Sequence, residues 1–209
     1  MAKVKICGIN DPLSLMAAAT ADMLGFVFYK GSPRHLSNDQ ATQLAAQCAP
    51  HIERVALLVD PDDERIDHCL GALSPHRIQL HGHETPARVR EIKNKFHRPI
   101  IKAFGIRTAE DLLQCAAYEE CADWFLFDAK PDVSELPGGN GKSFDWSVLS
   151  AYDGKTPWML SGGLTPENIS GAIAQTGALM VDVSSGVEKA PGEKDPNLIN
   201  AFIDAAQKI

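Results

Sequence analysis

The chain has 209 residues with a formal net charge of −7, and 44% of them are hydrophobic, a composition typical of a soluble globular protein with a buried core. No cluster of Lys and Arg occurs and no apolar run reaches the roughly 20 residues that cross a bilayer, so we expect neither a nucleic-acid nor a membrane partner, while a small anionic ligand stays possible. The five cysteines form no Cys-x-x-Cys pair and no signal-peptide pattern begins the chain, so we expect a cytoplasmic protein without disulfides or a zinc knuckle.

Eight short segments of β-branched, aromatic and other apolar residues recur along the chain, and several are unbroken apolar runs typical of strands covered on both faces. Turn residues and then an amphipathic, helix-like stretch come between them. In chain order, the predicted strands are residues 4–7, 25–28, 54–59, 77–80, 100–104, 124–127, 158–160 and 180–183.

Three of the intervening segments begin with recognisable helix start signals. Ser37 precedes a stretch that runs to Cys48, Thr108 opens the fifth segment, and Thr165 with Pro166 opens the seventh. The last helix is predicted over residues 197–207. Because strands that alternate with helices imply right-handed crossovers, we expect a parallel sheet.

Eight such units favour a closed parallel (β/α)8 barrel, the TIM-barrel architecture, although periodicity alone leaves an open doubly wound sheet possible. No linker, low-complexity tract or break in composition interrupts the chain, so we expect a single α/β domain over residues 1–209. The first strand is not followed by Gly-x-Gly-x-x-Gly, which disfavours a dinucleotide-binding fold.

Polar and glycine residues gather where the predicted strands end, which is where (β/α)8 barrels build their sites. The turns after the seventh and eighth strands hold glycines and hydroxyls that would cradle a phosphate, although two ordinary tight turns would look the same. The residues gathered in this way are Cys7, Arg34, Asp60, His81, Asp128, Gly162, Gly163, Ser184, Ser185 and Gly186.

The most specific motifs are Lys-Ile-Cys-Gly-Ile from Lys5 and Asp-Val-Ser-Ser-Gly-Val-Glu from Asp182, with Gln-Leu-His-Gly from Gln79 and Phe-Asp-Ala from Phe127 between them. In this order, and from Lys5 to Glu188, the motifs resemble those of the phosphoribosylanthranilate isomerase family. The resemblance implies a (β/α)8 barrel that catalyses an Amadori rearrangement in tryptophan biosynthesis. It also implies a small phosphorylated substrate and neither a metal nor an organic cofactor.

The resemblance also implies roles for individual residues. Cys7 would be the general base, Asp128 the general acid, and Arg34 the group that receives the anthranilate carboxylate. The two glycine-containing turns would hold the phosphate. From its place at a strand end, His81 could act as an acid or base, but we interpret it as a positioning residue, and Asp182 would either orient groups of the site or satisfy backbone donors. The working form is expected to be a monomer or a homodimer.

The chemistry explains why such an acid and base would suffice. An acid must protonate the furanose ring oxygen, and a base must then remove the C2′ proton from the protonated Schiff base, which is itself the electron sink. Asp128 must therefore carry a proton when substrate arrives, and the apolar run over residues 124–127 favours this. Cys7 must be available as a thiolate, which nearby cations would favour.

Two alternatives stay open. Another phosphosugar barrel enzyme would place metal-ligating His and Asp, or a catalytic Lys with Glu, at the strand ends, where this chain has Cys7 and Asp128. A non-catalytic barrel that only binds phosphorylated ligands would make Cys7 a small buried hydrophobe. The Gly-rich segment 138–141 would be either a lid over the substrate or a plain connection.

Overall fold

The computed structural model describes residues 1–130 and 143–208, and its centre is a closed barrel of eight parallel strands. Each strand pairs with its neighbours in chain order, and the first pairs with the last. The strands are β1 (Lys3–Cys7), β2 (Met23–Val27), β3 (Glu53–Leu58), β4 (Arg77–Leu80), β5 (Ile100–Ile106), β6 (Trp124–Ala129), β7 (Trp158–Leu160) and β8 (Met180–Val183). The predicted (β/α)8 barrel is confirmed.

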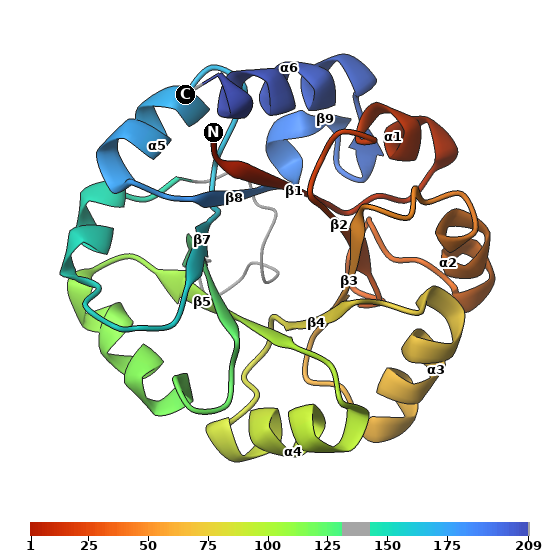
Figure 1. Ribbon diagram of the computed structural model, residues 1–209, viewed down its shortest axis with the longest axis horizontal. Helices are drawn as coiled ribbons and strands as arrows, with labels where there is room; N and C mark the ends of the chain where they lie inside the picture. The colour runs from red at the N-terminus through yellow and green to blue at the C-terminus, as the bar shows by residue number, and fades with distance from the viewer. Residues whose placement is uncertain (131–142, 209) are drawn as a thin grey trace.

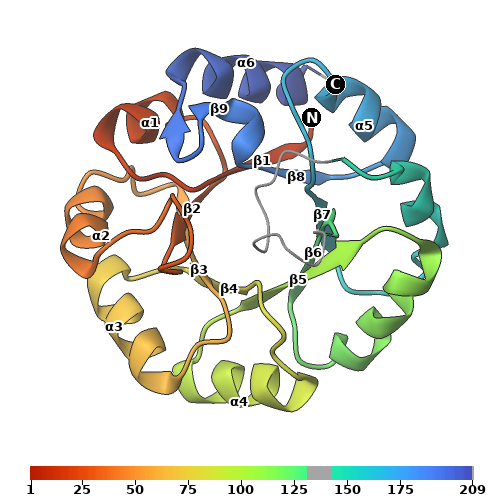
Figure 2. The same cartoon turned by 180° about the vertical axis from the view of Figure 1, so that it is seen from behind.

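Helices surround the barrel as an outer ring in both views of the ribbon (Figures 1 and 2). A short antiparallel hairpin of β9 (Glu188–Ala190) and β10 (Glu193–Lys194) follows the last barrel strand. The helical segments are α1 (Pro12–Ala17), α2 (Asn38–Ala45), α3 (Asp63–Leu73), α4 (Pro86–Phe96), the 3-10 segments η1 (Ala109–Tyr118), η2 (Trp146–Ala151) and η3 (Ser185–Val187), and α5 (Ile169–Thr176) and α6 (Pro196–Gln207).

The predicted helix starts fare differently. Ser37 caps α2 through a capping box with Gln40, as its position indicates, and η1 begins after Thr108 but in tighter 3-10 turns. The start predicted at Thr165 is wrong, because α5 begins only at Ile169. The Asn168 side chain accepts a hydrogen bond from the Thr165 amide and donates one to the Gly163 carbonyl, so this segment holds the turn after β7 together.

Alternate residues along each strand face the inside of the barrel and the helices. The outward residues form a large core with the helices, whereas the inward ones fill the lower barrel with an apolar layer. That layer is made of Met23, Val55, Ile101, Ala103, Leu126, Met159 and Met180. Closer to the carboxyl ends of the strands, Cys7, Val27 and Leu57 form a separate small cluster, so the barrel floor is packed beneath whatever occupies its upper end.

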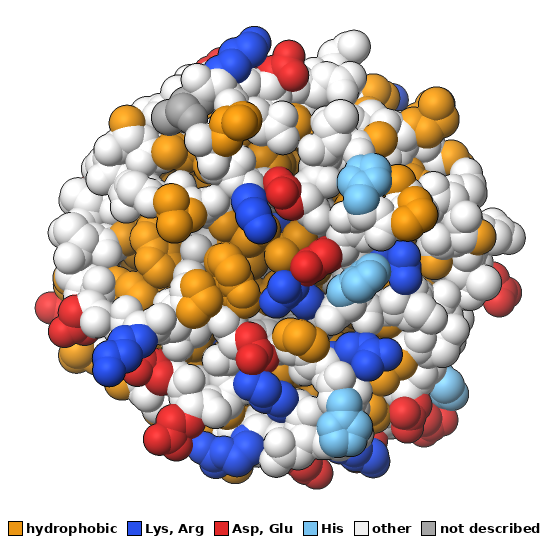
Figure 3. All heavy atoms as spheres, viewed as in Figure 1, with side chains coloured by type: hydrophobic (Ala, Val, Ile, Leu, Met, Phe, Trp, Pro, Cys, Tyr) orange, Lys and Arg blue, Asp and Glu red, His pale blue; other side chains and the backbone are white. Residues whose placement is uncertain are grey.

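On the molecular surface, Lys and Arg side chains lie next to Asp and Glu side chains and do not gather in one patch of the face in Figure 3. Arg77 with Glu53 and Lys93 with Asp123 are ion pairs of this kind. Among the described residues, no helix is both long and apolar enough to cross a bilayer.

Candidate active site

A pocket lies at the carboxyl ends of the barrel strands, and both residues predicted to transfer protons line it. Cys7 reaches it from the end of β1 and Asp128 from β6, from which β7 and β8 separate it in the closed strand order. The remaining lining residues are Val27, Tyr29, Ser32, Arg34, Leu57, Val59, Gln79, His81, Ser161, Asp182 and Ser184. The pocket is therefore lined from seven strands or the loops after them, and acidic, basic and thiol groups are among the side chains that it brings together.

Cys7 is buried, and the bare backbone of Gly25 on β2 gives its sulfur room. A Cβ at Gly25 would stand 2.8 Å from Cys7 Sγ. Burial raises the pKa of the Cys7 thiol, and Asp182 adds to the rise, whereas the cations Lys5, Lys194 and Arg34 oppose it. The expected cations are therefore present, but burial outweighs them and the resting group is a thiol.

This sign predicts how Cys7 reacts with an alkylating agent. Because only the thiolate attacks iodoacetamide, the alkylation rate of Cys7 should rise about tenfold per pH unit through the neutral range, with a midpoint above that of an ordinary cysteine. The measurement is the labelled fraction of the peptide that contains Cys7, by mass spectrometry, in a pH series. A midpoint below that of free cysteine would contradict the assigned direction.

Lys5 is a site residue that the sequence analysis missed. Its side chain is fully buried, and its Nζ lies 2.6 Å from Asp182 Oδ1. The other Asp182 oxygen accepts a hydrogen bond from Ser161 Oγ at 3.3 Å. The prediction that Asp182 orients groups of the site agrees with these two contacts, and the spacing of Lys5 two residues before Cys7 was the signal that could have placed it inside the barrel.

Asp128 lies within β6 and not after it, because β5 extends to Ile106 and pairs with the end of β6. Its carboxylate is buried, and Oδ1 accepts a hydrogen bond from the Ala129 amide at 2.8 Å. Oδ2 lies 3.5 Å from Nε2 of His81, whose Nδ1 is 2.9 Å from Gln79 Nε2. Gln79 thus holds the imidazole of His81 beside the proposed acid.

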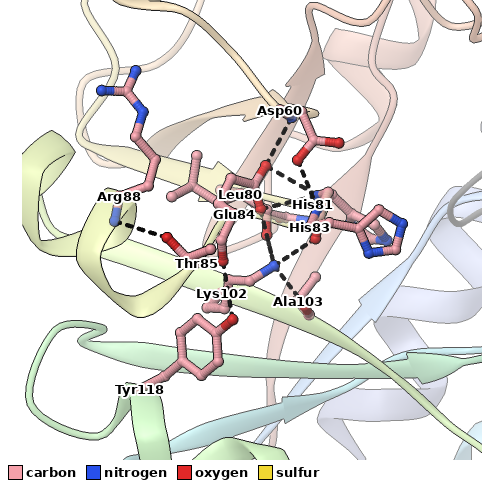
Figure 4. Close-up of polar contacts among 12 residues, drawn as sticks. Asp60, Leu80, His81, His83, Glu84, Thr85, Arg88, Lys102, Ala103 and Tyr118 are labelled. Carbon is pink, nitrogen blue, oxygen red and sulfur yellow. Dashed lines mark hydrogen bonds and ion pairs between the residues drawn. The ribbon is translucent and has the colours of Figure 1, made fainter.

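A buried ion pair, Glu84 with Lys102, stands behind the loop that carries His81 (Figure 4). Lys102 Nζ donates to Glu84 at 3.0 Å and to the carbonyl of Gly82 at 2.8 Å. The Glu84 carboxylate also accepts hydrogen bonds from the backbone amides of Gly82 and Asp60. These contacts join the ends of β3 and β4 to the middle of β5, so the pair fixes the loop from which His81 projects.

Replacing Glu84 by Gln would leave the Lys102 ammonium buried beside a neutral amide. We expect the free energy of unfolding to fall by roughly 3–5 kcal/mol, measured by urea unfolding. Glu91→Gln is the matched control, because Glu91 is exposed where it pairs with Arg88 and should change stability by less than about 1 kcal/mol. Equal free energies of unfolding for the two variants would contradict the stabilising role of the buried pair.

Arg34 lines the pocket, but its guanidinium already holds an acidic partner. Its Nε and Nη2 each donate to the Glu188 carboxylate at 2.7 Å. Lys194 from β10 is buried as well, and its Nζ contacts Glu188 at 2.8 Å and the Ser184 carbonyl at 2.9 Å. Burial would raise the pKa of Glu188, but Arg34 and Lys194 together lower it. The hairpin therefore adds a second cation, Lys194, to the site.

The two glycine-containing turns lie against each other. Gly162 and Gly163 have φ of +87° and +66°, in the left-handed region that favours glycine. A Cβ at Gly186 would stand 1.8 Å from the carbonyl oxygen of Leu164, so the turn after β8 packs directly on the turn after β7. Ser184 lies where Lys194 contacts this turn. The segment 138–141, predicted as a lid or a connection, lies outside the described residues.

A closed parallel barrel with a polar pocket at its carboxyl ends is the architecture of a (β/α)8-barrel enzyme. A family model described as N-(5'-phosphoribosyl)anthranilate (PRA) isomerase matches residues 4–205, and the chain belongs to this family. A relative from Parvibaculum lavamentivorans, N-(5'-phosphoribosyl)anthranilate isomerase, is 49% identical over 99% of this chain and 98% of its own.

Solved structures agree with this assignment. The phosphoribosyl anthranilate isomerase of Thermotoga maritima superposes with a TM-score of 0.89 at 35% identity, over the full length of both chains. A phosphoribosyl anthranilate isomerase in complex with reduced 1-(o-carboxyphenylamino)-1-deoxyribulose 5-phosphate superposes with a TM-score of 0.85 at 32% identity, again over both full chains. The family predicted from the sequence motifs is therefore confirmed.

Proposed function

We propose that the chain isomerises N-(5-phosphoribosyl)anthranilate to 1-(2-carboxyphenylamino)-1-deoxyribulose 5-phosphate, the Amadori rearrangement of tryptophan biosynthesis. The observation that carries the proposal is that Cys7 and Asp128 line the same pocket in a chain of this family. A structural neighbour that binds a reduced form of the product supports the substrate class. The protein would work in the cytoplasm as one barrel domain over residues 1–209, as a monomer or a homodimer.

The proposed mechanism has an acid step followed by a base step. Asp128 donates a proton to the furanose ring oxygen, the C1′–O bond breaks, and the anthranilate nitrogen supplies the electrons that form a protonated Schiff base. The Cys7 thiolate then removes the C2′ proton, and the C–H electron pair forms the double bond of an enolamine. The enolamine tautomerises to the ketone. His81, held by Gln79, positions the Asp128 carboxyl group.

The remaining lining residues would bind the two anionic ends of the substrate. The turns with Gly162, Gly163, Ser184, Ser185 and Gly186 would hold the phosphate, because they offer backbone N–H groups where barrels of this architecture bind phosphate. Lys194 would add a positive charge behind Ser184. Arg34 would face the anthranilate carboxylate with a guanidinium whose orientation is set by Glu188.

The phosphate assignment predicts the effect of Gly186→Ala. The new methyl group would collide with the Leu164 carbonyl and displace both turns, so we expect KM for the substrate to rise roughly 10–100-fold. Gly171→Ala in α5 is the matched control, because a Cβ there meets nothing within 4 Å. An unchanged KM in Gly186→Ala would contradict phosphate binding at these turns.

Turnover by the purified protein tests the proposal. The protein should convert phosphoribosylanthranilate and lower its anthranilate-type fluorescence, without added metal or organic cofactor. Binding of the substrate with no change of fluorescence beyond the uncatalysed rate would favour a barrel that binds phosphorylated ligands without catalysing a reaction. A dialysis step against a chelator beforehand should leave the rate unchanged.

A further inference from the structure

Lys5 is a buried charge that the proposed mechanism does not use. It lies two residues before Cys7 on β1, so both side chains face the inside of the barrel. The position of the missing Cβ of Gly25 measures how near they are, since that point is 2.8 Å from Cys7 Sγ and 3.2 Å from Lys5 Nζ. The ammonium thus lies close to the sulfur, on the side toward the apolar floor of the barrel.

The ion pair of Lys5 with Asp182 is not explained by stability alone. The interior of a (β/α)8 barrel is usually filled by branched apolar side chains, and both members of this pair are almost completely removed from water. A buried ion pair of this kind is often no more stabilising than apolar residues of the same volume. Its position between the proposed base and the barrel floor points to an electrostatic task.

We propose that Lys5 is a positioning residue that stabilises the reactive thiolate of Cys7 relative to its resting thiol, and that Asp182 limits how much of the Lys5 charge the sulfur experiences. The inference rests on the proposed role of Cys7 as the base. Lys5 keeps its proton throughout. When the thiolate takes the C2′ proton, the C–H electron pair moves into the new C1′=C2′ bond and reduces the iminium, so the negative charge beside Lys5 disappears.

The other charges around Cys7 come from several elements, and Lys5 makes the largest of the cationic contributions that oppose the burial of the thiol. Asp182 on β8 acts in the opposite direction. Among the described residues, the remaining charged or titratable groups that face the site are Tyr29, Arg34, His81, Asp128, Glu188 and Lys194. Because Asp182 and Lys5 carry opposite charges, removing one or the other should change the reactivity of the Cys7 sulfur in opposite directions.

The test is the rate at which iodoacetamide alkylates Cys7, followed by mass spectrometry at a fixed pH below its midpoint. Lys5→Met should slow the reaction by at least about tenfold, because a neighbouring opposite charge shifts a buried pKa by 1–3 units. Asp182→Asn should accelerate it. Lys102→Met is the matched control, since it removes another buried lysine with a carboxylate partner, but one that faces the helices, and it should leave the rate within about twofold.

Equal or faster alkylation in Lys5→Met would overturn the proposal. A substitution that only loosens the pocket exposes the sulfur and speeds alkylation, whereas loss of the Lys5 charge slows it. Should Lys5→Met not fold, Lys5→Met with Asp182→Asn leaves no unpaired buried charge. Compared with Asp182→Asn alone, the double variant must be alkylated more slowly. Alkylation requires no turnover, so a failed isomerase assay with the expected order of rates would remove the proposed function and leave the electrostatic role intact.

Discussion

Cys7→Ala should lower kcat/KM for phosphoribosylanthranilate by roughly 10²–10⁴-fold, the contribution of one positioned acid or base. No other side chain with a thiol lines the pocket among the described residues, and the substitution removes only a sulfur from a small cluster with Val27 and Leu57. We therefore expect the circular dichroism spectrum to be unchanged while steady-state turnover is lost.

Cys115→Ala is the matched control for this prediction. Cys115 is buried in η1 against the outer core, away from the pocket, so its removal leaves the proposed base in place. Its kcat/KM should match that of the unmodified chain. If Cys7→Ala kept the same activity as Cys115→Ala, the sulfur could not be the base.

Asp128→Asn should have an effect of the same size, roughly 10²–10⁴-fold on kcat/KM, but at the ring-opening step. The side-chain oxygen of Asn can still accept a hydrogen bond from the backbone N–H of Ala129. The geometry of β6 should therefore persist while the transferable proton is lost. The residual rate would be limited by cleavage of the C1′–O bond.

A substrate deuterated at C2′ separates the two variants. Its rate should equal that of the protiated substrate in Asp128→Asn, because the C2′ proton leaves after the slow step. Cys7→Ser, which keeps a weaker oxygen base, should retain a primary isotope effect. A large isotope effect in Asp128→Asn would instead assign proton removal from carbon to Asp128.

Much of the fold could be predicted from the sequence because its strands are short apolar runs bounded by turn residues. Three predicted strands, at β4, β7 and β8, have the observed boundaries. The end of β6 could not be located, since it depends on the partner register of β5, which joins Gly105 to Asp128. The start of α5 was wrong because Thr165 and Pro166 look alike in a helix cap and in a turn closed by Asn168.

The candidate site, too, could be predicted from the sequence only in part. Cys7 and Asp128 could be placed together because the carboxyl ends of parallel strands meet at one end of the barrel. The partners of buried charges could not, since Lys5 and Asp182 are 177 positions apart and meet only when β1 pairs with β8. The ion pair of Glu188 with Arg34 likewise depends on a hairpin that the strand pattern does not indicate.

The identity of the product formed by the unmodified chain tests the central claim most directly. Phosphoribosylanthranilate is a glycosylamine that also hydrolyses, so nuclear magnetic resonance spectra of the reaction mixture distinguish two fates. We predict that C2′ becomes a ketone carbon and C1′ a methylene next to the anthranilate nitrogen, at a rate far above the uncatalysed one. Recovery of only unreacted substrate, anthranilate and ribose 5-phosphate would contradict it.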